Sequence, residues 1–306
     1  MTFGAVMLHH FSGGRHPLGQ GAITAEEFDK LIVYLKKNYQ ILSPQEYANR
    51  AVSGKLLDVE TCITFDDGLK CQIDIATQVL DAHELFAYFF VYSGIFSDQP
   101  DRFEIFRDFR NTEFRTIDAF YAEFFVKLEK MYPAEWKQFE DAFPDDHLSE
   151  YKFYTANDRR FRYVRDYVLS DTVYGDLMRT MILETQYSEE EATERLWLTK
   201  KDVRRLSDHG HTIGLHSHSH SMLFDRLAIE EQKYEYRQNL NVMEAVTGKT
   251  INSMSHPCGL YTGQTLTILS ELGIYIGFRC NQHVAYNGNT LELPRIDHAD
   301  LMDKFR

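Results

Sequence analysis

The nearly unbroken apolar stretch LFAYFFVYSG, residues 85–94, constrains the fold of this chain more than any other segment. Such a run predicts a strand that is buried on both faces, as strands are in parallel sheets covered by helices. Two shorter strand patterns precede it, GAVMLHHF at 4–11 and TCITF at 61–65, and helix patterns lie between them. This alternation of strand and helix predicts a βαβ architecture, either a barrel or a doubly wound sheet.

The ends of the predicted helices are marked by capping residues. Thr24, followed three residues later by Glu27, predicts a capping box ahead of apolar residues at helical spacing. Ser43 and Pro44 predict the start of a second helix, and Gly248 predicts the end of a long one. These signals agree with the βαβ alternation.

Residues 97–196 interrupt this alternation. The stretch is charged, aromatic and helix-patterned, and it contains no convincing turn-bounded strand. The α/β pattern resumes after it and continues to TLELPRI at 290–296. We therefore predict an α/β body made of residues 1–96 and 197–306, with 97–196 as a largely helical insertion that is a possible cap over a site.

Charge and cysteine usage exclude several classes of protein. The formal net charge of −13 argues against a binder of nucleic acid or anionic membrane, because both require a basic face. No apolar run reaches the roughly 18 residues of a membrane span. The four cysteines form no CxxC pair, and no basic region followed by a long apolar stretch opens the chain. We expect a cytoplasmic protein with reduced thiols and no integral membrane segment; nothing in the sequence indicates its oligomeric state.

Two polar motifs stand at the ends of predicted strands, where α/β proteins build their sites. The first is TFDDG, residues 64–68. Adjacent carboxylates repel each other, so a bound cation or a proton must compensate their negative charges. One of Asp66 and Asp67 can bind a metal while the other stays free as a base. The alternative is a DDG turn or helix cap without a function, which is common.

The second motif is HSHSH, residues 216–220. In a strand its three histidines would share one face, whereas in a turn His216 and His220 would approach each other and His218 would point elsewhere. Histidines at positions i and i+4 can hold one divalent ion; the alternative is a polar strand with solvated histidines. With one aspartate they form a three-ligand set with open positions, as in catalytic zinc sites. A metal there would lower the pKa of a water and polarise a carbonyl, and the second aspartate would take the proton of the water.

TFDDG followed downstream by GHTIGLHSHSH resembles the motifs of the polysaccharide deacetylases, the NodB-homology or carbohydrate esterase family 4 enzymes. The segment LFAYFFVYSGIF is also similar to a strand of that family. The resemblance covers most of residues 1–96 and 197–298 and leaves out the insertion. It implies a deformed (β/α)7 barrel and a metal-dependent carbohydrate N-deacetylase, which hydrolyses an acetamide or related N-acyl group on a sugar or glycan precursor.

The resemblance also implies roles for individual residues. Asp66 would be the general base, and Asp67, His216 and His220 would bind a divalent metal. The family most often uses zinc, and a site of two histidines and an aspartate also accepts cobalt, nickel or iron. His218 falls on an unspecified position of the motif and is expected not to bind.

The third motif of the family, R-x-P followed by an aromatic residue, is altered in this chain. The matching stretch is SHPCG, with Ser255 in place of the arginine and Cys258 in place of the aromatic residue. In the family the arginine orients the base, and the backbone N–H after the proline donates to the oxyanion. A backbone N–H survives substitution, so we expect Cys258 to donate, and we expect Arg295 of LPRID to stand in for the arginine.

The fifth motif, L-x-H, supplies the general acid and usually lies near the C-terminus. Here Leu8-His9-His10 is an L-x-H at the end of the first predicted strand, similar to family members in which the motif is moved to the N-terminus. We expect His10 to be the acid, because an imidazole is suited to protonating a leaving amine near neutral pH. His298 is the second candidate, and a buried structural role for His10 is the alternative.

Other interpretations stay open at this point. The aromatic residues of the insertion predict stacking on sugar rings, or equally a helical cap that packs its own core or a dimer surface. A metal-dependent amidohydrolase acting on a non-sugar C–N bond would use the same barrel. The missing arginine of the third motif also allows a catalytically degenerate metal-binding protein.

Overall fold

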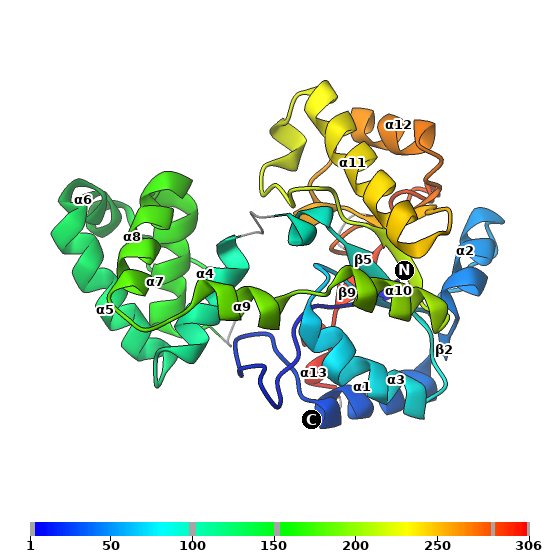
Figure 1. Ribbon diagram of the computed structural model, residues 1–306, viewed down its shortest axis with the longest axis horizontal. Helices are drawn as coiled ribbons and strands as arrows, with labels where there is room; N and C mark the ends of the chain where they lie inside the picture. Colours follow the sequence, from blue (N-terminus) through cyan, green and yellow to red (C-terminus); the bar gives the residue numbers. More distant parts are fainter. Residues whose placement is uncertain (1–3, 98–101, 150–153, 283–284, 305–306) are drawn as a thin grey trace. The chain divides into compact units, whose positions relative to one another are not determined.

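The structure is a computed structural model, and it describes residues 4–97, 102–149, 154–282 and 285–304. The chain divides into two compact units (Figure 1). The barrel unit comprises Met1–Arg102 and Thr193–Arg306, and the helical unit comprises Phe103–Ala192.

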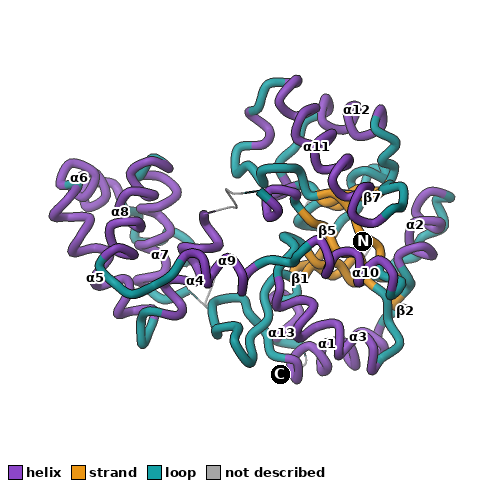
Figure 2. The backbone as a smooth tube through the Cα atoms, viewed as in Figure 1, coloured by secondary structure: helices purple, strands orange, loops and turns teal. Residues whose placement is uncertain are grey.

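Seven parallel strands form the main sheet of the described residues, in the order β8-β7-β6-β5-β4-β1-β9. Figure 2 shows the strands in orange within the barrel unit. Their bounds are β1 (Ala5–Leu8), β4 (Ile63–Phe65), β5 (Ala87–Val91), β6 (Thr212–Leu215), β7 (Ser253–Ser255), β8 (Ile276–Phe278) and β9 (Arg295–Asp297). A bridge between Phe278 and Leu293 joins β8 to the residues before β9 and nearly closes the sheet. The predicted deformed (β/α)7 barrel is confirmed.

The central strand β5 has the burial that its apolar sequence predicts. All five of its residues are buried, and the ring of Phe89 stacks on that of Phe65 in β4 at 4.6 Å between centroids. The strand stops at Val91, earlier than the apolar run, and Ser93–Phe96 forms a 3-10 turn. In the sheet, β5 lies between β4, which precedes TFDDG, and β6, which precedes HSHSH.

Helices cover the strands of the barrel unit. They are α1 (Ala25–Asn38), α2 (Pro44–Val52), α3 (Thr77–Ala82), α10 (Lys200–Asp208), α11 (Ile229–Thr247), α12 (Gly263–Glu271) and α13 (Ala299–Met302). The capping box at Thr24, the helix start at Ser43 and Pro44, and the helix end at Gly248 form as predicted. Ser43 also forms a capping box with Glu46, and Gly248 is left-handed.

Two predicted strands differ in the structure. TCITF divides into β4 and β3 (Glu60–Thr61), because β3 pairs with β2 (Gln40–Ile41) instead of the main sheet. TLELPRI is a regular strand only from Arg295, because its first half bonds to β8 and its second half to β1. The N–H of Leu293 donates to the carbonyl of Gly277, and its carbonyl accepts from Arg279. The carbonyl of the following residue, Pro294, accepts from Ala5.

The helical unit contains no strand in its described residues. Its helices are α4 (Arg102–Thr112), α5 (Ile117–Met131), α6 (Pro133–Ala142), α7 (Ala156–Tyr163), α8 (Asp171–Leu183) and α9 (Glu189–Leu196), of which α4 and α9 cross its boundaries. Aromatic side chains fill its core, where Phe124 packs edge-on against Phe161 at 4.9 Å between centroids. None of the helices in the described ranges is both long enough and apolar enough to cross a membrane.

Candidate metal and catalytic site

The two aspartates of TFDDG follow β4 directly and point into different surroundings. Asp66 continues the sheet, since its N–H donates to the carbonyl of Leu8 at 3.1 Å. Asp67 and Gly68 then adopt φ of 73° and 65°, which turns the chain sharply. A Cβ on Gly68 would lie 2.9 Å from the side chain of Val91, so the turn requires glycine for space as well as for its left-handed backbone.

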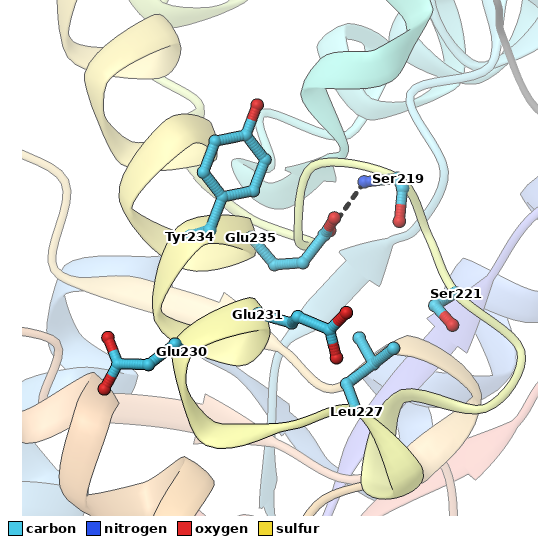
Figure 3. Close-up of a pocket in the computed structure, with 7 residues that line it drawn as sticks. All are labelled: Ser219, Ser221, Leu227, Glu230, Glu231, Tyr234 and Glu235. Atoms are coloured by element: carbon cyan, nitrogen blue, oxygen red, sulfur yellow. Dashed lines mark hydrogen bonds between the residues drawn. The ribbon is translucent and has the colours of Figure 1, made fainter.

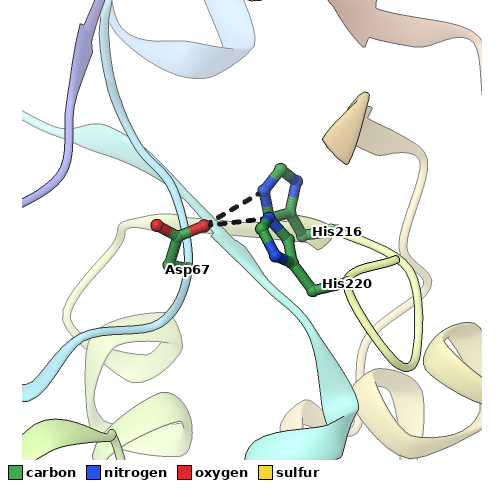
Figure 4. A group of neighbouring side chains, drawn as sticks. All are labelled: Asp67, His216 and His220. Carbon is green, nitrogen blue, oxygen red and sulfur yellow. Dashed lines mark ion pairs between the residues drawn. The ribbon is translucent and has the colours of Figure 1, made fainter. Parts of the chain in front are cut away.

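Asp67, His216 and His220 meet at the carboxyl ends of β4 and β6 (Figure 4). The Oδ1 atom of Asp67 lies 3.3 Å from Nε2 of His216 and 3.4 Å from Nε2 of His220. One candidate ligand atom from each residue lies within 4.8 Å of the others. Two imidazole nitrogens and a carboxylate oxygen form a donor set that suits zinc and similar divalent ions.

The tautomer of His216 tests whether this group fits a cation. Its Nδ1 lies 2.9 Å from the carbonyl oxygen of Ser255, which can only accept, so Nδ1 carries the hydrogen. In the neutral ring, Nε2 then presents a lone pair to the carboxylate of Asp67. Two acceptors that face each other need a cation or a proton between them, so the residues fit a metal.

Asp67 is also held in its charged form. Burial raises the pKa of its carboxyl. In the absence of a metal, a proton on Nε2 of His216 donates to Asp67, and this hydrogen bond, together with the charges of His220, His9 and His216, outweighs burial. The net pKa lies well below the ordinary value for an aspartate. Asp67 is therefore ionised, as a metal ligand must be.

His218 lies outside this group. Its Nδ1 is 2.8 Å from the hydroxyl of Ser93, and its ring packs edge-on against Tyr234. The neighbouring residues Ser217 and His220 have φ of 63° and 56°. This turn directs His216 and His220 toward Asp67, while His218 points elsewhere. The motif therefore forms a turn, and its three histidines do not share one face as they would in a strand.

Asp66 is held by Arg295, the residue predicted to replace the arginine of the third motif. The guanidinium donates from Nη1 to Oδ1 at 2.8 Å and from Nη2 to Oδ2 at 2.7 Å. The hydroxyl of Ser255 bridges the pair: it accepts from Nη2 at 2.7 Å and donates to Oδ2 at 3.1 Å. The sequence placed serine where an arginine was expected, and the structure puts an arginine from β9 against that serine.

The charge of Arg295 determines the ionisation of Asp66. Burial raises the pKa of Asp66, but Arg295, His216 and His9 lower it below the ordinary value. The Arg295 side chain is fully buried, and the Asp66 side chain is 3% exposed. The carboxylate therefore stays ionised with little solvent around it.

A histidine at the end of β1 approaches this pair. The Nε2 atom of His9 lies 3.9 Å from Oδ2 of Asp66, and the rings of His9 and His10 are parallel within 17° with centroids 6.3 Å apart. His9 was not singled out by sequence, which favoured its neighbour His10. The second candidate, His298, lies with Nδ1 3.1 Å from Oδ1 of Asp297.

Asp297 is a further acidic residue at this edge that sequence reasoning missed. Burial raises its pKa, but a hydrogen bond with His298 and the charges of His298 and His9 lower it to about 2. It follows Arg295 by two residues on β9, so a search for carboxylates at strand ends could have found it.

Cys258 lies in the tight turn Pro257–Gly259 that follows β7. Its φ is 53°, its side chain is exposed, and its Sγ lies 3.3 Å from Sδ of Met222. The role of its backbone N–H as an oxyanion donor stays a prediction.

Residues 175–277 match the family model described as "Polysaccharide deacetylase". The matched segment includes the histidine motif and does not include TFDDG. The predicted relationship to polysaccharide deacetylases is confirmed. The displacement of the L-x-H motif to the N-terminus stays a prediction.

Solved structures of deacetylases share the fold. The deacetylase PplD of Streptococcus pyogenes in complex with acetate aligns with a TM-score of 0.57 at 14% identity, over 100% of this chain and 99% of that one. IcaB from Ammonifex degensii gives 0.60 at 14% identity, over 99% and 94%. A de-N-acetylase from Aggregatibacter actinomycetemcomitans gives 0.59 at 13%, over 99% of both chains. No curated protein sequence matches the chain.

Proposed function

We propose that this protein is a metal-dependent N-deacetylase that hydrolyses an acetamide or related N-acyl group on a sugar or glycan precursor. The observation that carries the proposal is the separation of two adjacent aspartates. Asp67 faces two histidine nitrogens, and Asp66 faces an arginine. One carboxylate is thus available to a metal and the other to a proton, in a barrel related to polysaccharide deacetylases.

Asp67, His216 and His220 would hold a divalent metal, with zinc as the first candidate and cobalt, nickel or iron as the others. When bound, the metal would polarise the acyl carbonyl and lower the pKa of a water. Three protein ligands leave open coordination positions, which a catalytic site needs.

Asp66 would take a proton from the attacking water. Its lowered pKa keeps the carboxylate ionised and able to accept a proton. The two hydrogen bonds from Arg295 fix the orientation of its oxygens. Arg295 thereby supplies the positive charge that the third motif lacks in this chain. The absence of that charge was the reason for considering a degenerate site. The backbone N–H of Cys258 would donate to the oxyanion that forms at the carbonyl.

The leaving amine needs a proton, and we assign its donor to His9. His9 has its Nε2 directed at the base, 3.9 Å from Asp66, and its side chain is 28% exposed, so a substrate can reach it. The cytoplasmic location and a role of the helical unit in stacking on sugar rings remain predictions.

Acetate release from N-acetylated sugars, with and without a chelator, tests the proposal. We expect turnover that the chelator abolishes and zinc restores. Asp66→Asn should lower kcat at least a hundredfold, since general base catalysis contributes about 10²–10⁴-fold. Hydrolysis of simple non-sugar amides with no preference for sugars would instead favour an amidohydrolase.

Comparing His9→Ala with His10→Ala tests the assignment of the acid. We expect the His9 variant to lose kcat about a hundredfold or more and the His10 variant to keep most of it. The reverse result would restore His10 as the acid.

A further inference from the structure

A buried glutamate of α11 binds the backbone of the ligand loop, which we define as His216–His220. One oxygen of Glu235, Oε2, accepts the N–H groups of His218 at 2.9 Å and Ser219 at 2.7 Å. Figure 3 shows the bond to Ser219. Glu235 is only 7% exposed, so these bonds form largely away from water. Hydrogen bonds to a carboxylate are about twice as strong as neutral ones.

Asn239, one turn further along α11, binds the start of the same loop. Its Oδ1 accepts the N–H of His216 at 2.8 Å, and its Nδ2 donates to the carbonyl of Val91 at 2.9 Å. The asparagine is fully buried. It therefore ties the first histidine of the loop to the end of β5.

The loop needs such support because its backbone is strained. Ser217 and His220 have φ of 63° and 56°, in the left-handed region that side chains with a Cβ disfavour. Residues persist in such conformations only when their surroundings determine them. Ser217 also accepts the N–H of His220 through its hydroxyl at 3.1 Å.

The far side of the loop is bound by the 3-10 turn after β5. Ser93 donates its N–H to the carbonyl of Ser217 at 3.2 Å, and Gly94 donates to that of His218 at 2.7 Å. The loop is thus held between backbone donors on one side and the acceptors of α11 on the other. The contacts of α11 with the loop backbone come from the side chains of Glu235 and Asn239, so substitutions can remove them without changing the backbone.

Glu235 differs from the other glutamates at the start of α11. A pocket of about 420 Å³ is lined by Glu230, Glu231 and Glu235 together with loop residues (Figure 3). Glu231 accepts the N–H of Ala228 and caps the helix, and Glu230 is exposed and pairs with Lys233. Of these three glutamates, only Glu235 hydrogen-bonds the ligand loop within the described part of the chain.

We propose that Glu235, assisted by Asn239, is a positioning residue that fixes the ligand loop before a metal binds. It holds the backbone so that Nε2 of His216 and His220 already face Asp67. Binding then requires little reordering of the loop, and the affinity for the metal is correspondingly higher. The effect on affinity rests on the proposed function, in which these residues bind a metal.

Zinc affinity of the metal-free, full-length protein tests the proposal, measured by competition with a chromogenic chelator. Glu235→Ala should weaken binding about tenfold or more, the usual loss when a partner of metal ligands is removed. Glu235→Gln should keep most of the affinity, because its amide oxygen still accepts both N–H groups. Glu230→Gln, at an exposed position in the first turn of the same helix, should match the unaltered protein.

Two outcomes would overturn the proposal. One is unaltered zinc affinity in Glu235→Ala; the other is a Glu235→Gln protein as weak as Glu235→Ala, which would assign the effect to charge instead of loop position. If Glu235→Ala does not fold, Glu235→Asp replaces it, since the shorter side chain keeps the charge but withdraws the acceptor. Unfolding midpoints of the metal-free variants separate loss of affinity from loss of fold.

Amide hydrogen exchange separates a failure of this inference from a failure of the proposed function. In the metal-free protein we expect the amides of His218 and Ser219 to be protected, and to lose that protection in Glu235→Ala while the amides of β5 keep theirs. If the unaltered protein binds neither zinc nor cobalt, nickel or iron, the proposed function fails, and the exchange result alone decides whether Glu235 holds the loop. Unchanged protection in Glu235→Ala would contradict it.

Discussion

At the scale of single residues, the site depends on a buried ion pair that a single substitution can break. Asp66 and Arg295 are joined by two hydrogen bonds and are almost fully removed from water. Removing one partner of such a pair leaves an uncompensated buried charge, which costs about 3–5 kcal/mol. The pair therefore affects both the ionisation of Asp66 and the stability of the barrel.

Substituting Arg295 should change the pH dependence of catalysis. Because the charge and hydrogen bonds of Arg295 lower the pKa of Asp66, Arg295→Gln should raise that pKa, and activity should be lost at a higher pH on the acid side. The pH profile of kcat/KM measures this shift. Arg295→Lys, which keeps the charge but loses the two-pronged contact, should give a smaller shift and serves as the variant more certain to fold. An acid limb that stays in place in both variants would contradict the assignment of Asp66 as base.

The three histidines of HSHSH should respond differently to substitution. His216→Ala removes one of the candidate ligands and should abolish tight zinc binding, whereas His218→Ala should retain it, because His218 is directed to Ser93. Calorimetric titration of the metal-free variants measures both. Equal loss in the two variants would show that His218 also binds. With zinc at a hundred times its Kd, the unaltered protein should gain about 2.7 kcal/mol of stability, and the His216 variant should gain none.

At the scale of elements, the sequence predicted the site through the ends of strands. TFDDG and HSHSH follow β4 and β6, which flank β5, and the carboxyl ends of parallel strands meet at one edge of a sheet. Asp67 therefore meets His216 and His220 for a reason that is visible in the sequence. The alternation of strand and helix likewise predicted the barrel.

Features that depend on the approach of distant segments were not predictable in this way. The choice between His9 and His10 depends on where β1 ends, and a shift of one residue turns a side chain to the opposite face. Glu235 and Asn239 carry no motif, because their partners are backbone groups from another element. Their spacing with Gln232 placed polar side chains on the buried face of α11, which was the signal that could have found them.

The 3-10 turn after β5 should tolerate no side chain at Gly94. A Cβ there would lie 2.7 Å from the carbonyl oxygen of His218, a backbone atom that cannot move without moving the ligand loop. Gly94→Ala should therefore weaken zinc affinity about tenfold, in the range for lost support of metal ligands. Gly263→Ala, where a Cβ meets nothing within 4 Å, is the matched control and should leave affinity unchanged. Equal affinities for both variants would show that the loop adapts to the new side chain.

At the scale of the whole molecule, two buried histidines link folding to pH. Burial lowers the pKa of both His211 and His256 to about 4. The Nδ1 atom of His211 accepts the N–H of Ala87 at 3.3 Å, so protonation would also break a buried hydrogen bond. The unfolded chain binds protons at these positions near pH 6.5, before the folded chain does. Stability is therefore lost as the pH falls from about 6.5 to about 4.

Removing one of these histidines should reduce this loss. A pKa difference of about 2.5 units corresponds to about 3 kcal/mol, so His211→Asn should lose about that much less stability between pH 7 and pH 4. Asparagine retains an acceptor for the N–H of Ala87. Urea unfolding of the metal-free proteins at several pH values measures the difference. A decline with pH as steep as that of the unaltered protein would contradict the burial of a neutral His211.

The position of Arg295 has a consequence for how the protein is made. Arg295 follows Asp66 by 229 residues and belongs to the last strand of the barrel to leave the ribosome. Until β9 has been synthesised, Asp66 lacks its counter-charge and β1 lacks its outer neighbour, although Asp67, His216 and His220 are already part of the chain. The catalytic site that we propose can therefore be complete only after β9 has paired with β1.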